Sequence, residues 1–186
     1  TPGGQTALVS GTSVDLVDSA TPYLTLRVES RDGEVINTGS VSSGRIDMHG
    51  AVVKQDGALQ ASEMALDASG TIVLRATRSA TLGAGSTTVA AGGVVDMKAA
   101  EVTVAGRVDV SGMAGGGTVS IGGTPWAEGG ARVVRVESGA VINADATQQG
   151  NGPGLSPRTL GQTFGVWGMR PGPYVVWPFL GSSTAR

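Results

Sequence analysis

Four short segments decide the fold that the sequence predicts. Each begins with glycine and continues with hydrophobic residues at alternate positions: Gly44-Arg-Ile-Asp-Met48, Gly70-Thr-Ile-Val-Leu74, Gly93-Val-Val-Asp-Met97 and Gly117-Thr-Val-Ser-Ile121. Their glycines lie 26, 23 and 24 residues apart. Alternation with a period of two is typical of a half-buried β-strand, and a fixed spacing of this size indicates a repeat architecture.

A second glycine-led motif follows each of the four. Its copies are Gly57-Ala-Leu-Gln-Ala61, Gly85-Ser-Thr-Thr-Val89, Gly106-Arg-Val-Asp-Val110 and, less regularly, Gly139-Ala-Val-Ile-Asn143. The offset between the two motifs is 13, 15 and 13 residues, and it grows to 22 in the last pair. The segment Pro125-Trp-Ala-Glu-Gly-Gly130 has the composition of an inserted loop there. We expect the leading glycines to adopt turn conformations that other residues resist.

These motifs predict an all-β protein, a parallel β-helix of about four or five coils. Two or three short strands would form each coil, and each strand would pair with its equivalent one coil away, at about 4.8 Å. Equivalent inward side chains would then stack in columns, because no coil can bury its inner face unaided. The expected columns are Ile46, Ile72, Val95 and Val119, and Met48, Leu74, Met97 and Ile121. An antiparallel β-sandwich is the alternative, but it does not predict a regular period.

Composition agrees with a β-protein and excludes several classes. Of 186 residues, 31 are glycine, only 15% are charged and 4% are aromatic, while mean hydropathy is +0.10. A disordered polyelectrolyte would be richer in charge, and a helical bundle would be poorer in glycine. The net charge of −2 offers no basic surface for nucleic acid. The absence of cysteine excludes disulfides and thiolate sites.

The chain changes character near residue 150. Residues 1–150, the predicted β-helix segment, hold all 15 acidic residues. Residues 151–186 begin with a Gly/Pro linker and continue as an aromatic-rich tail, which we expect to be irregular. This tail holds five of the seven aromatic residues, namely Phe164, Trp167, Tyr174, Trp177 and Phe179.

The repeat segment resembles the filamentous haemagglutinin family over about residues 12–151. The resemblance lies in the order of motifs such as Ser13-Val-Asp-Leu-Val-Asp18, Ile36-Asn-Thr-Gly-Ser-Val41, Gly70-Thr-Ile-Val-Leu-Arg-Ala76 and Gly139-Ala-Val-Ile-Asn-Ala-Asp-Ala146. It implies a right-handed β-helix from a secreted adhesin on the surface of a Gram-negative bacterium. Its implied partners are a glycan or protein of a host or neighbouring cell and an outer-membrane secretion partner. An Asn-Pro-Asn-Gly-type secretion signature is not found here.

The tail resembles a different family. The run from Leu160 to Arg186 contains Gln162-Thr-Phe-Gly165, Trp167-Gly168 and Gly172-Pro-Tyr174, and it is similar to the MlaA/VacJ lipoproteins. This resemblance implies contact with the outer membrane and with phospholipids, which that family passes inward to a periplasmic carrier. Ser182 stands where the family usually has proline, and no lipobox cysteine is present. An outer-membrane phospholipid-trafficking fusion is therefore the alternative function, with the five tail aromatics as its lipid-contacting residues.

Candidate catalytic groups are few. A polysaccharide-active β-helix enzyme would need clustered carboxylates on adjacent coils, but Asp47 and Asp96 would lie two rungs apart with Val73 between them. We expect both to occupy a solvated strand face. Ser43, Asp47 and His49 could form a triad in principle, but no nucleophile elbow surrounds them, and we expect this histidine at the surface. We predict no enzymatic activity, cofactor or metal.

Two features outside the repeat are candidates for interaction or capping. Trp126 lies in the inserted loop and could present an aromatic surface to a sugar or protein; the favoured alternative is that it packs down and caps the corner where the period breaks. Residues Tyr23 to Val28 are expected to form an edge or capping strand, because the terminal coils of a solenoid need cover. The leading functional prediction is a rigid structural shaft that displays loops for attachment.

Overall fold

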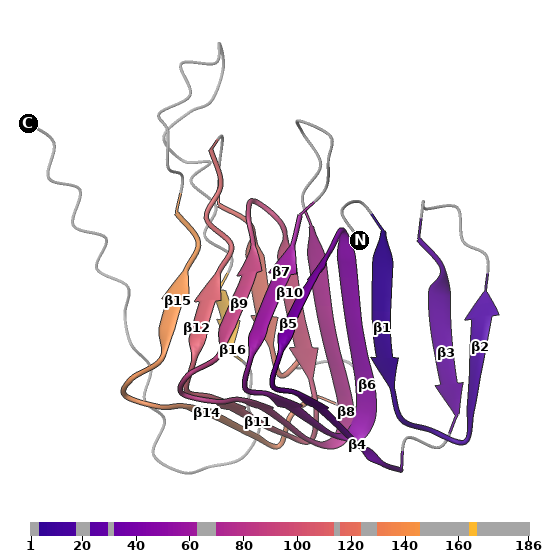
Figure 1. The fold of residues 1–186 in the computed structure, drawn as a ribbon. Helices are drawn as coiled ribbons and strands as arrows, with labels where there is room; N and C mark the ends of the chain where they lie inside the picture. Colours follow the sequence, from indigo (N-terminus) through magenta and orange to yellow (C-terminus); the bar gives the residue numbers. More distant parts are fainter. Residues whose placement is uncertain are drawn as a thin grey trace, which may run out of the picture.

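The computed structural model describes residues 4–17, 23–29, 32–62, 70–113, 116–123 and 130–145, together with the backbone of a strand at 164–166. Within these ranges the protein is all-β and has no helix (Figure 1). Nine strands form the largest sheet: β1 (Gln5–Val9), β4 (Glu34–Asn37), β6 (Arg45–Gln55), β8 (Thr71–Leu82), β10 (Val94–Lys98), β11 (Glu101–Val104), β13 (Thr118–Ile121), β14 (Val133–Val136) and β16 (Phe164–Val166). Five strands form the second: β5 (Ser40–Ser43), β7 (Ala58–Ala61), β9 (Thr87–Ala90), β12 (Arg107–Asp109) and β15 (Val141–Asn143).

Both of these sheets are parallel and open-ended. The nine-stranded sheet runs in the order β1-β6-β8-β10-β13-β16; β4 and β11 pair with the second halves of the long strands β6 and β8, and β14 pairs with β11. The five-stranded sheet has the order β15-β12-β9-β7-β5. In Figure 1, β4, β11 and β14 cross the lower side of the molecule, below the upright strands of the five-stranded sheet. Each repeat thus contributes in turn to three groups of strands. The first is the row β1-β6-β8-β10-β13-β16, the second contains β4, β11, β14 and the second halves of β6 and β8, and the third is the five-stranded sheet.

The strand register confirms the predicted columns. Ile46 pairs with Ile72, which pairs with Val95, and Val95 pairs in turn with Val119. The second column is equally regular and contains Met48, Leu74, Met97 and Ile121. All eight side chains are at most 2% exposed. Burial of these aliphatic columns supplies the main favourable free energy of folding.

The parallel pairing excludes the antiparallel β-sandwich for this part of the chain. A repeat of 23 to 26 residues is compatible with this pairing, since parallel neighbours need a long connection between them. The winding of these strands into a β-helix, its right-handedness and its number of coils stay predictions.

The repeat glycines serve close approach, not unusual turns. A Cβ atom on Gly93 would lie 2.0 Å from the carbonyl oxygen of Gly70, and one on Gly117 would lie 2.0 Å from that of Gly93. Such distances are sterically forbidden, so only glycine fits between adjacent backbones. Among the described glycines, positive φ occurs instead at Gly92, Gly122 and Gly123. The expectation that the repeat glycines adopt special turn conformations is therefore wrong.

The second motif is aligned differently from the sequence-based expectation. In the five-stranded sheet Ala58 pairs with Thr87, which pairs with Arg107. This register places Ser86, and not Gly85, in the row of Gly57 and Gly106. A shift of one residue reverses the facing of a strand. As a result Thr88 enters the buried column and is fully inaccessible.

The two motifs do not predict the group of strands that contains β4, β11 and β14. Strands β6 and β8 have 11 and 12 residues instead of the expected five, and the register between them shifts between Gly50 and Val52. Their second halves pair with β4 and β11. One inward column in this group begins with two amides and becomes aliphatic: Asn37, Gln55, Leu82, Val104 and Val136.

An antiparallel hairpin stands at the N-terminal end of the molecule, beyond β1 (Figure 1). It consists of β2 (Ser13–Val17) and β3 (Thr25–Glu29), so a strand forms within the predicted capping segment. Val14 pairs with Val28 and Leu16 with Leu26, and Leu16 is 63% exposed. The amide of Gln5 ties this hairpin to β1, because it bonds both the N–H and the carbonyl of Leu24.

The tail is not wholly irregular. Strand β16 pairs in parallel with β13, so that Val119 is opposite Phe164 and Ile121 is opposite Val166. These positions extend the rows of the two aliphatic columns by one strand. The expectation that the tail is irregular is therefore wrong at residues 164–166.

Candidate functional site

Charged side chains occupy the outer face of β6, β8 and β10. The strand register places His49, Arg75 and Lys98 in one row and Asp47, Val73 and Asp96 in the next. Together with Arg45, at the start of β6, they form what we call the outer charged face. Its charged and titratable members are Arg45, Asp47, His49, Arg75, Asp96 and Lys98. In-register stacking therefore brings side chains from distant parts of the sequence next to one another on one face.

Asp47 is the best-enclosed carboxylate of this face. It is 1% exposed and accepts hydrogen bonds from Nε of Arg45 at 2.9 Å and from Nε2 of Gln5 at 2.8 Å. Burial raises the pKa of Asp47, whereas the neighbouring His49, Arg45 and Gln5 favour the carboxylate and bring the pKa below its ordinary value. The expectation of a solvated position is wrong here, since β1 adds Gln5 on one side and β8 adds Val73 on the other.

His49 is also buried, contrary to expectation. Its side chain is 8% exposed, and Nε2 lies 4.0 Å from Oδ1 of Asp47, too far for a hydrogen bond. Neither ring nitrogen has a hydrogen-bond partner. The ring lies in register between Val9 and Arg75, which accounts for its burial. Ser43 donates its hydroxyl to the carbonyl of Gly4 at 2.8 Å, so these residues do not assemble a nucleophile–base relay.

The second carboxylate of the face is paired separately. Asp96 forms an ion pair with Arg75, and both side chains are about one quarter exposed, at 28% and 27%. Val73 is the register partner of both Asp47 and Asp96, which confirms the predicted two-strand separation of the carboxylates. Because each carboxylate already has its own arginine, the pair does not resemble an acid–base couple that shares a proton.

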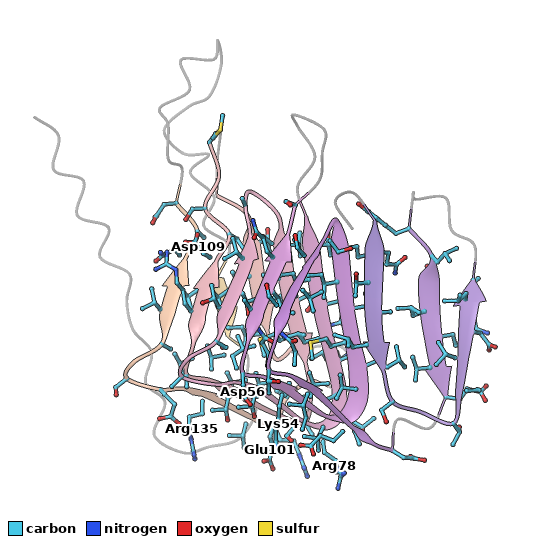
Figure 2. All side chains as sticks on the ribbon, viewed as in Figure 1. Lys54, Asp56, Arg78, Glu101, Asp109 and Arg135 are labelled. Atoms are coloured by element: carbon cyan, nitrogen blue, oxygen red, sulfur yellow. The ribbon has the colours of Figure 1, made fainter. Side chains whose placement is uncertain are left out.

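A second set of charges lies on the lower side of the molecule. Lys54, Arg78, Glu101 and Arg135 project away from the stack there, whereas Asp109 lies on the five-stranded sheet (Figure 2). Lys54 pairs with Glu34, and this neighbour raises the pKa of Lys54. On β12, burial raises the pKa of Asp109, but the Ser111 N–H and hydroxyl and the Arg107 guanidinium lower it below its ordinary value. Exposed pairs of this kind contribute little stability each.

The C-terminal side of the stack exposes part of its apolar interior. Val136 is in register with the buried Val104, yet it is 46% exposed. Within the described ranges, β14 pairs only with β11, and β15 pairs only with β12. The inward side chains Val134 and Ile142 are likewise only partly buried against the core. We call the free side of β14 the C-terminal edge.

Most of the predicted interaction residues lie outside the described part of the chain. These are Trp126 in the inserted loop and Trp167, Tyr174, Trp177 and Phe179 in the tail. Phe164 is placed only as the first residue of β16. The role of Gln5 was missed, since nothing in its local sequence reveals two partners 19 and 42 residues away.

The described residues contain neither a metal-binding cluster nor a membrane-spanning helix. Over these ranges, no three histidine, aspartate or glutamate side chains come together in a way that could hold a metal ion. The same ranges contain no helix long and apolar enough to cross a bilayer.

The C-terminal end of the chain matches a known protein family. Residues 143–186 match the family model of the MlaA lipoprotein. This segment starts at Asn143, the last residue of β15, and it includes β16. No curated protein sequence and no solved structure matches the chain. The C-terminal segment is thus similar to MlaA lipoproteins, and part of it pairs with the parallel β-structure that precedes it.

Proposed function

We propose that this protein belongs to the Gram-negative cell envelope, where its MlaA-like C-terminal segment contacts outer-membrane phospholipid. The family match over residues 143–186 carries this proposal. The pairing of β16 with β13 supports it, because it attaches the segment to a β-scaffold with a well-packed interior. The proposed role is non-enzymatic: the scaffold holds an aromatic segment against lipid.

The aromatic residues of the segment are the proposed lipid contacts. Tryptophan and tyrosine favour the membrane–water interface, because one end of each ring is apolar and the other can hydrogen-bond. The candidates are Phe164, Trp167, Tyr174, Trp177 and Phe179. The family resemblance also suggests an activity, namely that the protein passes phospholipid to another carrier.

Flotation with vesicles tests the lipid contact. The full chain is mixed with vesicles of phosphatidylethanolamine and phosphatidylglycerol, and the floating fraction is measured. We expect binding by the unmodified protein and a reduction of about tenfold when Trp167, Tyr174 and Phe179 are changed to alanine, which corresponds to roughly 1.4 kcal/mol. Trp126→Ala is the matched control, because this tryptophan lies outside the MlaA match. Equal flotation of both variants would contradict the proposal.

A second candidate function is a β-helical display shaft of a surface adhesin. The in-register aliphatic columns favour it, since stacked repeats of this kind make rigid scaffolds that present loops. In this case the loop around Trp126 would meet a glycan or protein of another cell. Beads coated with the full chain would then adhere to cells, and Trp126→Ala would weaken adhesion whereas the tail variant would not.

A further inference from the structure

The C-terminal edge has the features of a strand-pairing site whose partner strand is missing. Val136 continues a column that is completely buried one strand earlier, at Val104, yet it remains 46% exposed. Within the described residues no strand pairs with the free backbone side of β14. Proteins avoid leaving such an edge uncovered, because it can recruit another chain.

The tail of the same chain returns to this end of the molecule. Strand β16 already pairs with β13, the strand that precedes β14 along the chain. Each repeat passes from the first group of strands to the group that contains β4, β11 and β14. The residues that follow β16 therefore start one step before the C-terminal edge.

The tail also contains a segment of matching length. Strands β4, β11 and β14 each have four residues, and the run Tyr174-Val-Val-Trp177 has four residues between Pro173 and Pro178. Its residues are β-branched or aromatic, which favours a strand. A flanking proline tends to end strand pairing, because it lacks a backbone N–H. Seven residues separate this run from β16, compared with two between β10 and β11 and eleven between β13 and β14.

We propose that residues 174–177 add a parallel strand to the C-terminal edge of β14. The register follows from the other strands of the group, in which the second and fourth residues point inward, as Val102 and Val104 do. Val175 then covers Val134, and Trp177 covers Val136, so in the docked state Trp177 packs against the stack and the other tail aromatics are left for lipid. Tyr174 and Val176 remain on the outside. This docking goes beyond the proposed function, since it holds whether or not the tail meets lipid.

Disulfide trapping tests the register directly, because the natural chain has no cysteine. In-register neighbours on parallel strands lie about 4.8 Å apart, within the Cα separation of a disulfide. The full chain carrying Arg135→Cys and Val176→Cys is oxidised, and the product is mapped by mass spectrometry after proteolysis. We expect an intramolecular disulfide. The matched control, Arg135→Cys with Val175→Cys, places the second thiol on the opposite face and should form at least tenfold less.

Three outcomes of the trapping would overturn the proposal. Equal yields from the two pairs would mean that the tail samples the edge without a register. No disulfide in either pair would mean that the tail does not dock. Disulfides between two chains would mean that a second copy occupies the edge. None of these outcomes depends on vesicle binding, so failure here is distinguishable from failure of the lipid proposal.

Tryptophan fluorescence provides an independent readout. In the full chain with Trp126→Phe and Trp167→Phe, Trp177 is the remaining tryptophan. Val136→Glu should shift its emission to longer wavelength and increase quenching by acrylamide at least twofold, because the charge would face the docked ring. Val133→Glu on the same strand is the control, since Val133 lies on the outer face and is already 47% exposed. An identical response to both substitutions would contradict the docking.

Discussion

The side-chain amide of Gln5 joins β1 to β6 through the carboxylate of Asp47, with 2.8 Å between Nε2 and Oδ2. The same amide bonds the backbone of Leu24, just before β3, the second strand of the N-terminal hairpin. One glutamine therefore connects three parts of the N-terminal end that are far apart in the sequence. The arrangement makes this end of the stack sensitive to a single side chain.

Gln5→Ala should destabilise the protein by about 1–3 kcal/mol, because hydrogen bonds to a charged group and to backbone are lost together. Urea unfolding measures the change in free energy. Hydrogen exchange adds a local readout, since the N–H of Leu24 donates to Oε1 of Gln5 at 2.9 Å and should exchange faster in the variant. The exposed Gln60 on β7 provides the control variant Gln60→Ala. An unchanged exchange rate at Leu24 would contradict the bridging role.

Asp47 should make stability depend on pH in the acidic range. The pKa of this carboxyl is lower in the folded protein than its ordinary value, so its contribution is present above about pH 4 and is lost as pH falls through the lowered pKa. We expect Asp47→Asn to be less stable than the natural protein at pH 7 and to lose less stability on acidification to pH 2.

Thermal unfolding between these pH values measures the effect. Asp15→Asn, which removes an exposed carboxylate on β2, is the control and should retain the natural pH profile. If Asp47→Asn and the natural protein lost stability in parallel, Asp47 would not be a source of the acid sensitivity.

Thr88→Val should stabilise the protein. The Thr88 hydroxyl is buried without a hydrogen-bond partner, and its column neighbours are Leu59 and Val108. Valine has nearly the same shape and removes the desolvation cost of the hydroxyl, so we expect a gain of about 1 kcal/mol. Thr87→Val changes the adjacent outward position and should be nearly neutral. A loss of stability in the Thr88 variant would show that the hydroxyl is satisfied.

The two buried amides should behave as a coupled pair. Asn37 donates to Oε1 of Gln55 at 2.7 Å, and Gln55 donates to the carbonyl of Gly57 at 3.0 Å. Each single change to leucine should cost about 1–3 kcal/mol, because it leaves buried polar groups without partners. The double variant should cost less than the sum of the singles, since the next member of the column is already Leu82. Strict additivity in urea unfolding would contradict the coupling.

The strand register of the first motif could be predicted from the sequence, because the spacing of its glycines and the alternation of its hydrophobic residues both indicate which residues align. The columns of Ile46 and Met48 follow directly from these two signals. The row of Gly57 could not be predicted as reliably, because Ser86 occupies the equivalent position beside Gly85. Steric fit against the neighbouring backbone decides that row, and this depends on the whole strand.

The environment of the outer charged face could not be predicted in the same way. Alternation shows that Asp47 points outward, but it does not show that Gln5 will bond to it from another strand. It also does not show that Val9 and Arg75 will lie on either side of His49. Long-range neighbours determine the burial of these side chains, and their identities are not contained in the local pattern.

The row of glycines at Gly70, Gly93 and Gly117 affects which insertions and deletions this repeat protein can tolerate. A Cβ atom on Gly93 would meet Gly70, and one on Gly117 would meet Gly93, at the same 2.0 Å, so these two junctions between repeats are sterically equivalent. Loss of residues 70–92 would bring Val95 opposite Ile46 and Val102 opposite Val53, and each aliphatic row would remain continuous. Recombination can therefore remove or duplicate whole units without redesigning the interior, whereas an insertion of a few residues within a strand would misalign every row beyond it.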